Sequence, residues 1–178
     1  MSGLLSLLTQ RDDTLARRDT DELLRLNDLT RPYGLSLTHE DAVALLKVRA
    51  EALKNSSRIE VGPGILEKLG EAFCDSAYIN GQNYADTLCA LTELFYYLKN
   101  DTLDSLPDDD LIGVMKQCFD DDCEGSLELL AGRDMEAMAR NVRAYGRIEV
   151  PPETDGLAAG QGGGYEVEED EQWRTVRF

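Results

Sequence analysis

The chain has 178 residues and a formal net charge of −17 at pH 7, and 42% of its residues are hydrophobic. The hydrophobic fraction is sufficient for a packed core, and the length favours a single domain. Negative charge on this scale repels phosphate backbones and anionic headgroups, so the composition argues against nucleic acid and against a membrane surface as partners.

The N-terminal sequence and the cysteines indicate a soluble, cytoplasmic protein. No basic stretch precedes the first leucines, and Ser6 and Thr9 interrupt the apolar run well short of the ~18 residues that span a bilayer. The chain has four cysteines: Cys74, Cys89, Cys118 and Cys123. In the cytoplasm they should be reduced thiols that fill the core. Their spacing matches no paired metal motif, so we expect no metal and no other cofactor.

Helical periodicity dominates the beginning of the chain. Leucines in residues 4–15 suggest a first helical stretch without a clear cap. Residues 19–30 predict a helix that begins at a Thr20 cap and ends before the turn of residues 31–34.

The next helix has the clearest start signal. Thr38 is expected to cap it, with Asp41 three residues further on completing a capping box. The helix is expected to end at residues 55–57. Its predicted buried side follows the helical spacing of four apolar residues, Val43, Leu46, Ala50 and Leu53.

A short alternating segment, Arg-Ile-Glu-Val at residues 58–61, is read as extended, and the same four residues recur at 147–150. The repeat has two readings. It is either a coincidence or a minor two-stranded β ribbon that ties the end of the domain to its middle. Isolated two-stranded ribbons are marginal unless they pack on helices, so the sequence leaves both open.

The rest of the body is also predicted to be helical. A Gly-Pro-Gly turn at residues 62–64 should start a helix with four inward residues, Ile65, Leu66, Leu69 and Phe73. Residues 80–99 carry the longest apolar stripe and should form the central helix. Further helices are expected at residues 107–119, 125–131 and 134–145. We therefore predict an all-α domain, a compact bundle of six or seven helices over residues 1–146.

Residues 147–178 are expected to form a flexible, acidic tail rich in glycine and proline. Such a composition buries too little apolar area to offset the entropy of ordering. Its last residues differ, because they combine apolar and basic side chains: Trp173, Arg174, Val176, Arg177 and Phe178. We expect this end to bind a partner surface, namely an acidic surface of its own or a neighbouring chain.

The acidic loop of residues 120–128 resembles a calcium-binding EF-hand loop. Asp120, Asp122 and Glu124 fall at the first three ligand positions, and Gly125 falls where the loop turns sharply. The twelfth position, which normally supplies a bidentate glutamate, is Ala131. The sequence therefore favours an acidic turn between helices over a metal site, with weak calcium binding as an alternative.

Catalysis has one candidate, because His39 is the only histidine. A small enzyme that pairs His39 with a cysteine is the alternative from another class, and it requires the two side chains in one pocket. His39 also fits the first turn of a helix as a capping-region residue. We recognise no catalytic set in the sequence.

Several short stretches resemble an uncharacterised family of small bacterial cytosolic helical proteins. They are Ile-Leu-Glu-Lys-Leu from residue 65, Ala-Phe-Cys-Asp-Ser from 72, Asn-Tyr-Ala-Asp-Thr-Leu from 83, Glu-Leu-Phe-Tyr-Tyr-Leu-Lys-Asn from 93, Asp-Asp-Leu-Ile from 109 and Gly-Ser-Leu-Glu from 125. The resemblance spans about residues 4–145. It implies a helical intracellular domain and supplies no activity.

The functional expectation is a non-enzymatic protein-interaction or regulatory module with an acidic surface. Residues 59–128 hold sixteen acids against three lysines, a net charge of −13. Such a surface attracts a basic protein partner at long range. Whether the chain forms a homo-oligomer is left open.

Overall fold

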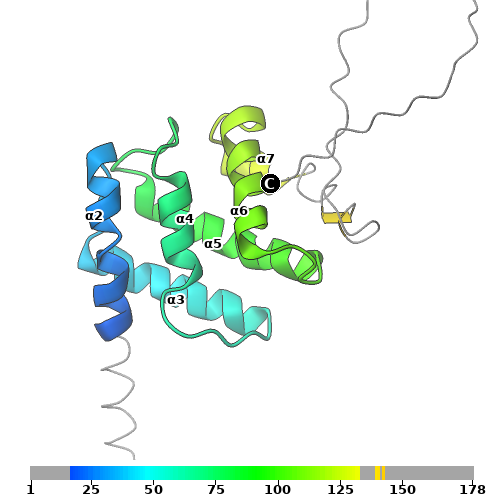
Figure 1. Cartoon of the computed structure of the whole chain (residues 1–178), viewed down its shortest axis with the longest axis horizontal. Coiled ribbons are helices and arrows are strands. Elements are labelled where there is room, and N and C mark those ends of the chain that lie inside the picture. Colours follow the sequence, from blue (N-terminus) through cyan, green and yellow to red (C-terminus); the bar gives the residue numbers. More distant parts are fainter. Residues whose placement is uncertain (1–16, 133–138, 141, 143–178) are drawn as a thin grey trace, which may run out of the picture.

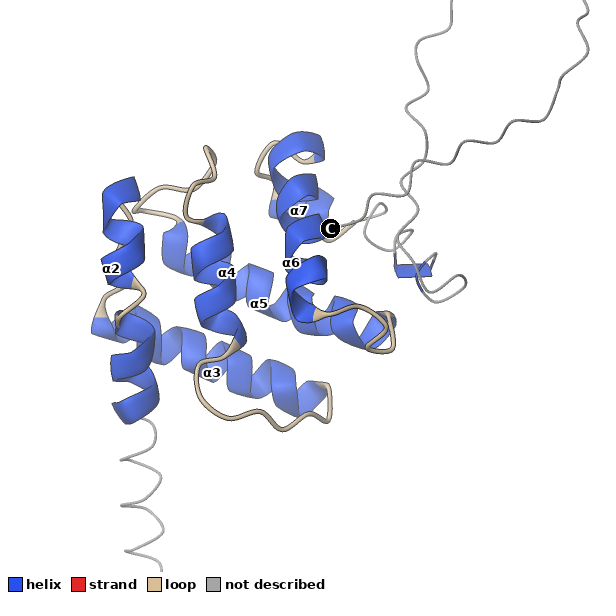
Figure 2. Cartoon of the chain, in the orientation of Figure 1, coloured by secondary structure: helices blue, strands red, loops and turns tan. Residues whose placement is uncertain are grey.

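The computed structural model describes residues 17–132, 139–140 and 142, and in these residues the fold is all-α with no strand. Residues 17–24 are helical and precede six labelled helices (Figures 1 and 2). These are α2 (Asn27–Thr30), α3 (His39–Asn55), α4 (Ile65–Phe73), α5 (Tyr84–Asp101), α6 (Asp108–Gln117) and α7 (Leu127–Leu130). The predicted compact helical bundle is confirmed. None of the helices in these residues has the length and apolar character needed to cross a bilayer.

The first described helix does not start at a Thr20 cap as expected, because Thr20 is a buried residue inside residues 17–24. The helix also does not run on to residue 30. It is interrupted at residues 25–26, and α2 follows. The side-chain amide of Asn27 bonds the backbone of Leu37 twice, with its Oδ1 accepting from the amide at 2.7 Å and its Nδ2 donating to the carbonyl at 2.9 Å. This long-range pairing is invisible in the local pattern.

The start of α3 is the predicted one. The Thr38 hydroxyl accepts from the Asp41 amide, and Asp41 Oδ2 accepts from the Thr38 amide at 2.8 Å, which is a complete capping box. The predicted buried side of α3 is only partly right. Leu53 is buried, Val43 and Leu46 are half-buried, and Ala50 is exposed. The buried side also includes a charged residue, which the apolar pattern could not indicate: Ala42, Leu45, Arg49, Ala52 and Leu53.

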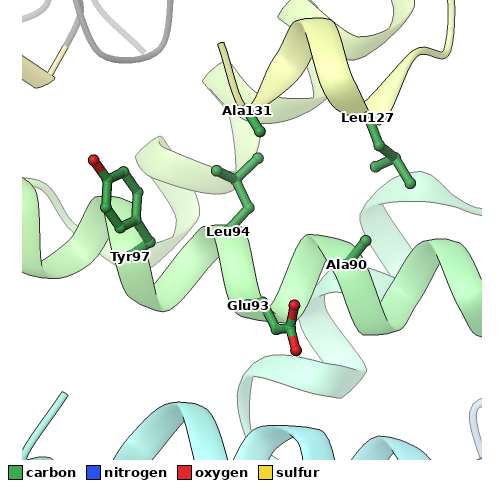
Figure 3. A pocket seen from close by; sticks show the side chains of 6 residues that line it. All are labelled: Ala90, Glu93, Leu94, Tyr97, Leu127 and Ala131. Atoms are coloured by element: carbon green, nitrogen blue, oxygen red, sulfur yellow. The ribbon is translucent and has the colours of Figure 1, made fainter. Parts of the chain in front are cut away.

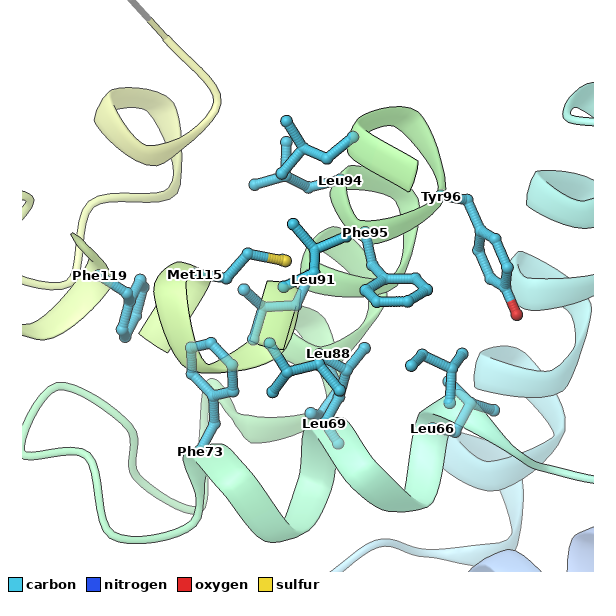
Figure 4. Packing of buried hydrophobic residues seen from close by; sticks show 14 of the residues in the cluster. Leu66, Leu69, Phe73, Leu88, Leu91, Leu94, Phe95, Tyr96, Met115 and Phe119 are labelled. Carbon is cyan, nitrogen blue, oxygen red and sulfur yellow. The ribbon is translucent and has the colours of Figure 1, made fainter. Parts of the chain in front are cut away.

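Helix α5 is the central helix, as predicted. It contacts α3, α4, α6 and α7, and its stripe from Tyr84 to Leu98 is fully buried. Figure 4 shows side chains of α4, α5 and α6 meeting in one core. The two adjacent tyrosines of α5 differ in exposure, because Tyr96 is buried whereas Tyr97 is 53% exposed. Only one face of this helix therefore remains open to solvent.

The second half of the body departs slightly from the expected boundaries. Helix α6 ends at Gln117 and continues as a π-helical turn, Cys118–Asp122, which buries Phe119. Helix α7 is short and is capped by the Ser126 hydroxyl. In the turn before α4, Gly64 is the N-cap, so Pro63 lies one position before the helix boundary rather than at its first position.

Two expectations can be compared with the structure only in part. Residues 58–61 do not form a strand. Their proposed partner at 147–150 lies outside the described residues. Of the helix expected at 134–145, only residues 139, 140 and 142 are described, and Ala139 and Val142 are buried. Residues 1–16 and the tail, including Trp173, Arg174, Val176, Arg177 and Phe178, also lie outside.

Candidate functional site

A surface groove lies between α5 and α7 and is the best candidate for a binding site. It has a volume of about 440 Å³ and is lined by six residues, Ala90, Glu93, Leu94, Tyr97, Leu127 and Ala131 (Figure 3). We call it the α5/α7 groove. Its lining is mainly apolar, with one carboxylate and one phenol. It therefore suits an apolar side chain that has a basic neighbour.

The groove exists because α7 is too short to cover the open face of α5. Helix α7 has four residues and contacts α5, and Leu130 is its buried anchor. On α5, Glu93 and Tyr97 lie four residues apart, so they are neighbours along the helix surface. Glu93 is exposed, and Tyr97 keeps about half of its surface in solvent. An aromatic side chain in this setting is typical of an interaction surface.

The acidic loop already holds a cation from the chain itself. Lys116 Nζ lies 2.7 Å from Asp120 Oδ2 and 2.8 Å from Asp75 Oδ1. The Ser76 hydroxyl donates to Asp120 Oδ1 at 2.5 Å. Asp120 therefore ties the end of α4 to the π-helical turn after α6. In the described part of the chain, no group of three histidine, cysteine or acidic residues is arranged to hold a metal ion.

The glycine that suggested a calcium loop has a packing reason. Gly125 has a φ of 80°, which L side chains rarely adopt, and a Cβ at this position would overlap Tyr78. Tyr78 in turn packs edge-on against Phe119, with ring centroids 6.3 Å apart. Asp122 and Glu124 are exposed beside this turn. The spacing that resembled an EF-hand is thus explained by the junction of α6 and α7.

His39 and the cysteines of the enzymatic alternative are not among the residues that line the groove. His39 is the first residue of α3 and is exposed. Cys74, Cys89 and Cys118 are half-buried, and Cys123 is buried. Burial raises the pKa of Cys74 and of Cys89, and nearby carboxylates add to the rise, so the thiolate that a nucleophile needs is disfavoured.

The sequence interpretation missed a partly buried polar cluster between α3 and α5. Arg49 Nη2 lies 3.0 Å from Glu60 Oε2, and the Tyr96 hydroxyl donates to the same oxygen at 2.7 Å. Burial, followed by the Glu60 carboxylate, raises the pKa of Tyr96. The only signal in the sequence was Arg49, which lies on an apolar face of the helix. The same pattern is equally compatible with an arginine exposed to solvent.

A comparison with protein families identifies the chain's relatives. The model of DUF6323, described as a family of unknown function, matches residues 22–148. The chain belongs to DUF6323. The resemblance expected from the short stretches is therefore confirmed as membership of a family without an assigned activity. No curated protein and no solved structure matches the chain.

The DUF6323 match locates the groove and the cluster within the family's domain. It includes α2 to α7, so both lie inside it. It begins at residue 22, later than the expected start near residue 4, and it ends at residue 148. Most of the acidic tail, including residues 173–178, lies beyond the C-terminal end of the matched residues.

Proposed function

We propose that this DUF6323 protein is a non-enzymatic protein-interaction module whose α5/α7 groove binds an apolar side chain next to a basic one. The groove is the observation that carries the proposal. Its apolar lining includes Ala90, Leu94 and Leu127, and Glu93 supplies a negative charge. Apolar burial would provide affinity, and the carboxylate would select the basic neighbour.

The charge around the groove supports a basic partner. All residues that line the groove, except Ala131, belong to residues 59–128. This stretch has a net charge of −13. Within the described residues all three of its lysines, Lys68, Lys99 and Lys116, already pair with aspartates. The stretch therefore keeps a large net negative charge that would attract a basic protein. Salt should weaken that attraction, since the Debye length falls to about 3 Å at 1 M.

The end of the chain has the chemistry that the groove would select. Residues 173–178 combine Trp173, Val176 and Phe178 with two arginines. They follow Val142, the last described residue, by about thirty positions, which gives a flexible linker a root-mean-square reach of roughly 30 Å. We infer that this end competes with a partner for the groove, so that the tail regulates access to it.

The proposal also includes a cytoplasmic location, because four free cysteines fit a reducing compartment. A neighbouring chain can supply the tail end as well as the same chain. In that case the module would form weak homo-oligomers at high concentration.

A pull-down from the native host tests the proposal, with wild-type protein and two charge-matched variants as bait. Glu93→Lys reverses the charge in the groove, whereas Glu51→Lys makes the same change on the exposed side of α3. We expect the wild type and Glu51→Lys to retain the same basic protein at low salt, and Glu93→Lys to retain little of it. High salt should release the partner from all three.

Two outcomes would contradict the proposal. Equal retention by Glu93→Lys and Glu51→Lys would place the interaction outside the groove. Absence of any retained protein at either salt concentration would remove the support for a protein-interaction module.

A further inference from the structure

Residues 58–61, here called the strap, are fixed to the body at their first residue. The connection after α3 is a Schellman motif, in which the Arg58 amide donates to the Leu53 carbonyl at 2.8 Å and the Ser57 amide donates to the Lys54 carbonyl at 3.1 Å. The Arg58 side chain then reaches α5 and the turn beyond it. Its Nε donates to Asn100 Oδ1 at 3.2 Å, and its Nη2 lies 2.6 Å from Asp104 Oδ2.

The third residue of the strap is fixed as well. Glu60 Oε2 accepts from buried Arg49 and from Tyr96, which joins the strap to α3 and α5. Gly64 closes the loop in the left-handed region at a φ of 45°, and a Cβ there would lie 3.3 Å from Arg49 Nη2. The body thus holds Arg58 and Glu60 with charged hydrogen bonds, which are stronger than neutral ones.

The alternate residues of the strap face solvent. Ile59 is 97% exposed and Val61 is 93% exposed. Side chains that alternate between the body and solvent are typical of an extended segment. Within the described residues, the amides of Ile59, Glu60 and Val61 make no hydrogen bond. The strap therefore presents an unpaired edge with β-branched side chains, and it runs between α3 and α4 at the periphery of the molecule (Figure 2).

We propose that residues 147–150 of the same chain add to the strap as an antiparallel strand, with Ile148 opposite Ile59. Unpaired extended edges bind other extended segments through their backbone groups. In this register Arg58 faces Glu149 and Glu60 faces Arg147, so both cross-strand pairs join opposite charges. The two isoleucines pair on the outer face.

The other registers of the two segments are less favourable. A parallel arrangement in step places Arg58 beside Arg147 and Glu60 beside Glu149. An antiparallel shift that sets Ile59 opposite Val150 brings Glu60 and Glu149 together. Like charges directly opposite destabilise a pair of strands. Charge complementarity thus selects the register with Ile59 opposite Ile148.

The small size of the edge favours a segment of the same chain over a separate partner. A stable interface buries about 800 Å² on each side, far more than four extended residues offer. A tethered segment instead binds at an effective concentration in the millimolar range. Val142 is buried in the body, and Arg147 follows it by five residues, a reach of about 17 Å when extended.

Disulfide trapping in the full chain tests the pairing. The double variant Ile59→Cys/Ile148→Cys should form an intrachain bond under mild oxidation at low protein concentration, identified by mass mapping. The control Ile59→Cys/Glu149→Cys puts the second thiol on the other face of the proposed strand and should form at least tenfold less of the bond. Equal trapping in both variants, no trapping, or trapping only between chains would overturn the proposal.

Amide hydrogen exchange gives a readout that needs no new thiols. In the wild-type chain the amides of Ile59 and Val61, which face the added strand when Ile59 and Ile148 form a hydrogen-bonded pair, should exchange at least tenfold more slowly than those of an unpaired loop. Ile148→Pro removes one donor and should restore fast exchange in the strap while leaving α5 protected. Fast exchange of the strap in the wild type would contradict the pairing.

Discussion

At the scale of single residues, Leu103 occupies a position better suited to glycine. Helix α5 ends in a Schellman motif, in which the Leu103 amide donates to the Asn100 carbonyl and the Asp104 amide donates to the Lys99 carbonyl. Leu103 has a φ of 52° and is 74% exposed, so its side chain adds strain and little packing. A left-handed conformation costs an L residue about 1–2 kcal/mol.

We expect Leu103→Gly to raise the free energy of unfolding by about 0.5 kcal/mol, the strain relieved minus the backbone entropy of glycine. Urea unfolding measures the change. The control Leu129→Gly removes a leucine of similar exposure from within α7 and should destabilise by about 1 kcal/mol. A loss of stability in both variants would show that the strain at Leu103 is negligible.

Two buried phenols make the stability fall at high pH. Burial raises the pKa of Tyr84 to about 12, and burial together with Glu60 raises that of Tyr96. A raised pKa in the folded state means that the unfolded phenol ionises first, near pH 10. The stabilisation is therefore complete below pH 10 and is lost as the pH rises toward the folded pKa values.

Phenylalanine variants separate these two tyrosines. Among the described residues, the Tyr84 hydroxyl makes no hydrogen bond of ordinary geometry, although Thr30 lies near it. Tyr84→Phe should thus be nearly neutral at pH 7 and should reduce the loss of stability between pH 9 and 11 by about 1 kcal/mol. Tyr96→Phe removes a bond to a carboxylate and should lower stability at pH 7 by about 1.5 kcal/mol. Urea unfolding across this pH range distinguishes them.

At the scale of elements, one glycine within α6 and one at the α6–α7 junction have opposite roles. Gly113 lies within α6, and a Cβ there meets nothing within 4 Å. Gly113→Ala should stabilise the protein by about 1 kcal/mol. Gly125→Ala should destabilise it by roughly 3 kcal/mol, because the position has a positive φ and the added methyl overlaps Tyr78. Thermal unfolding compares them, and a mild effect of Gly125→Ala would contradict the packing explanation of this glycine.

The elements that the sequence predicts well are those set by local signals. The capping box at Thr38 and the long stripe of α5 each depend on residues within one or two helical turns. The buried side of α3 was misjudged because Arg49 is neutralised by Glu60, eleven residues away. The break after residue 24 was missed for a similar reason, since Asn27 pairs with the backbone of Leu37. Long-range polar contacts thus override local periodicity.

The candidate site was less predictable than the helices that form it. The groove combines Tyr97 of α5 with Leu127 of α7 and with Ala131, which follows α7. Their position depends on how the junction at Gly125 packs against Tyr78. The acidic character of the surface followed from composition alone. The groove within this acidic surface could be identified only from the structure.

At the scale of the whole molecule, the proposed function has the charge and the tail act on the same surface. The body is strongly acidic, and the end of the tail carries Arg174 and Arg177. Attraction within one chain does not depend on concentration, whereas capture by a neighbouring chain does. Under the proposed function, a basic partner would compete with a tethered segment, and this competition would set a threshold for partner binding.

Trp173 is the only tryptophan, so its fluorescence reports the position of the tail end directly. If the end occupies the α5/α7 groove, emission should be shifted to shorter wavelength and shielded from a soluble quencher. Glu93→Lys should move both properties toward those of free tryptophan, and the charge-matched Glu51→Lys should leave them unchanged. A shift that grows with protein concentration would assign the groove to a neighbouring chain's tail. Emission and quenching like those of free tryptophan at every concentration would mean that the tail end does not dock, and the partner would then meet an open groove.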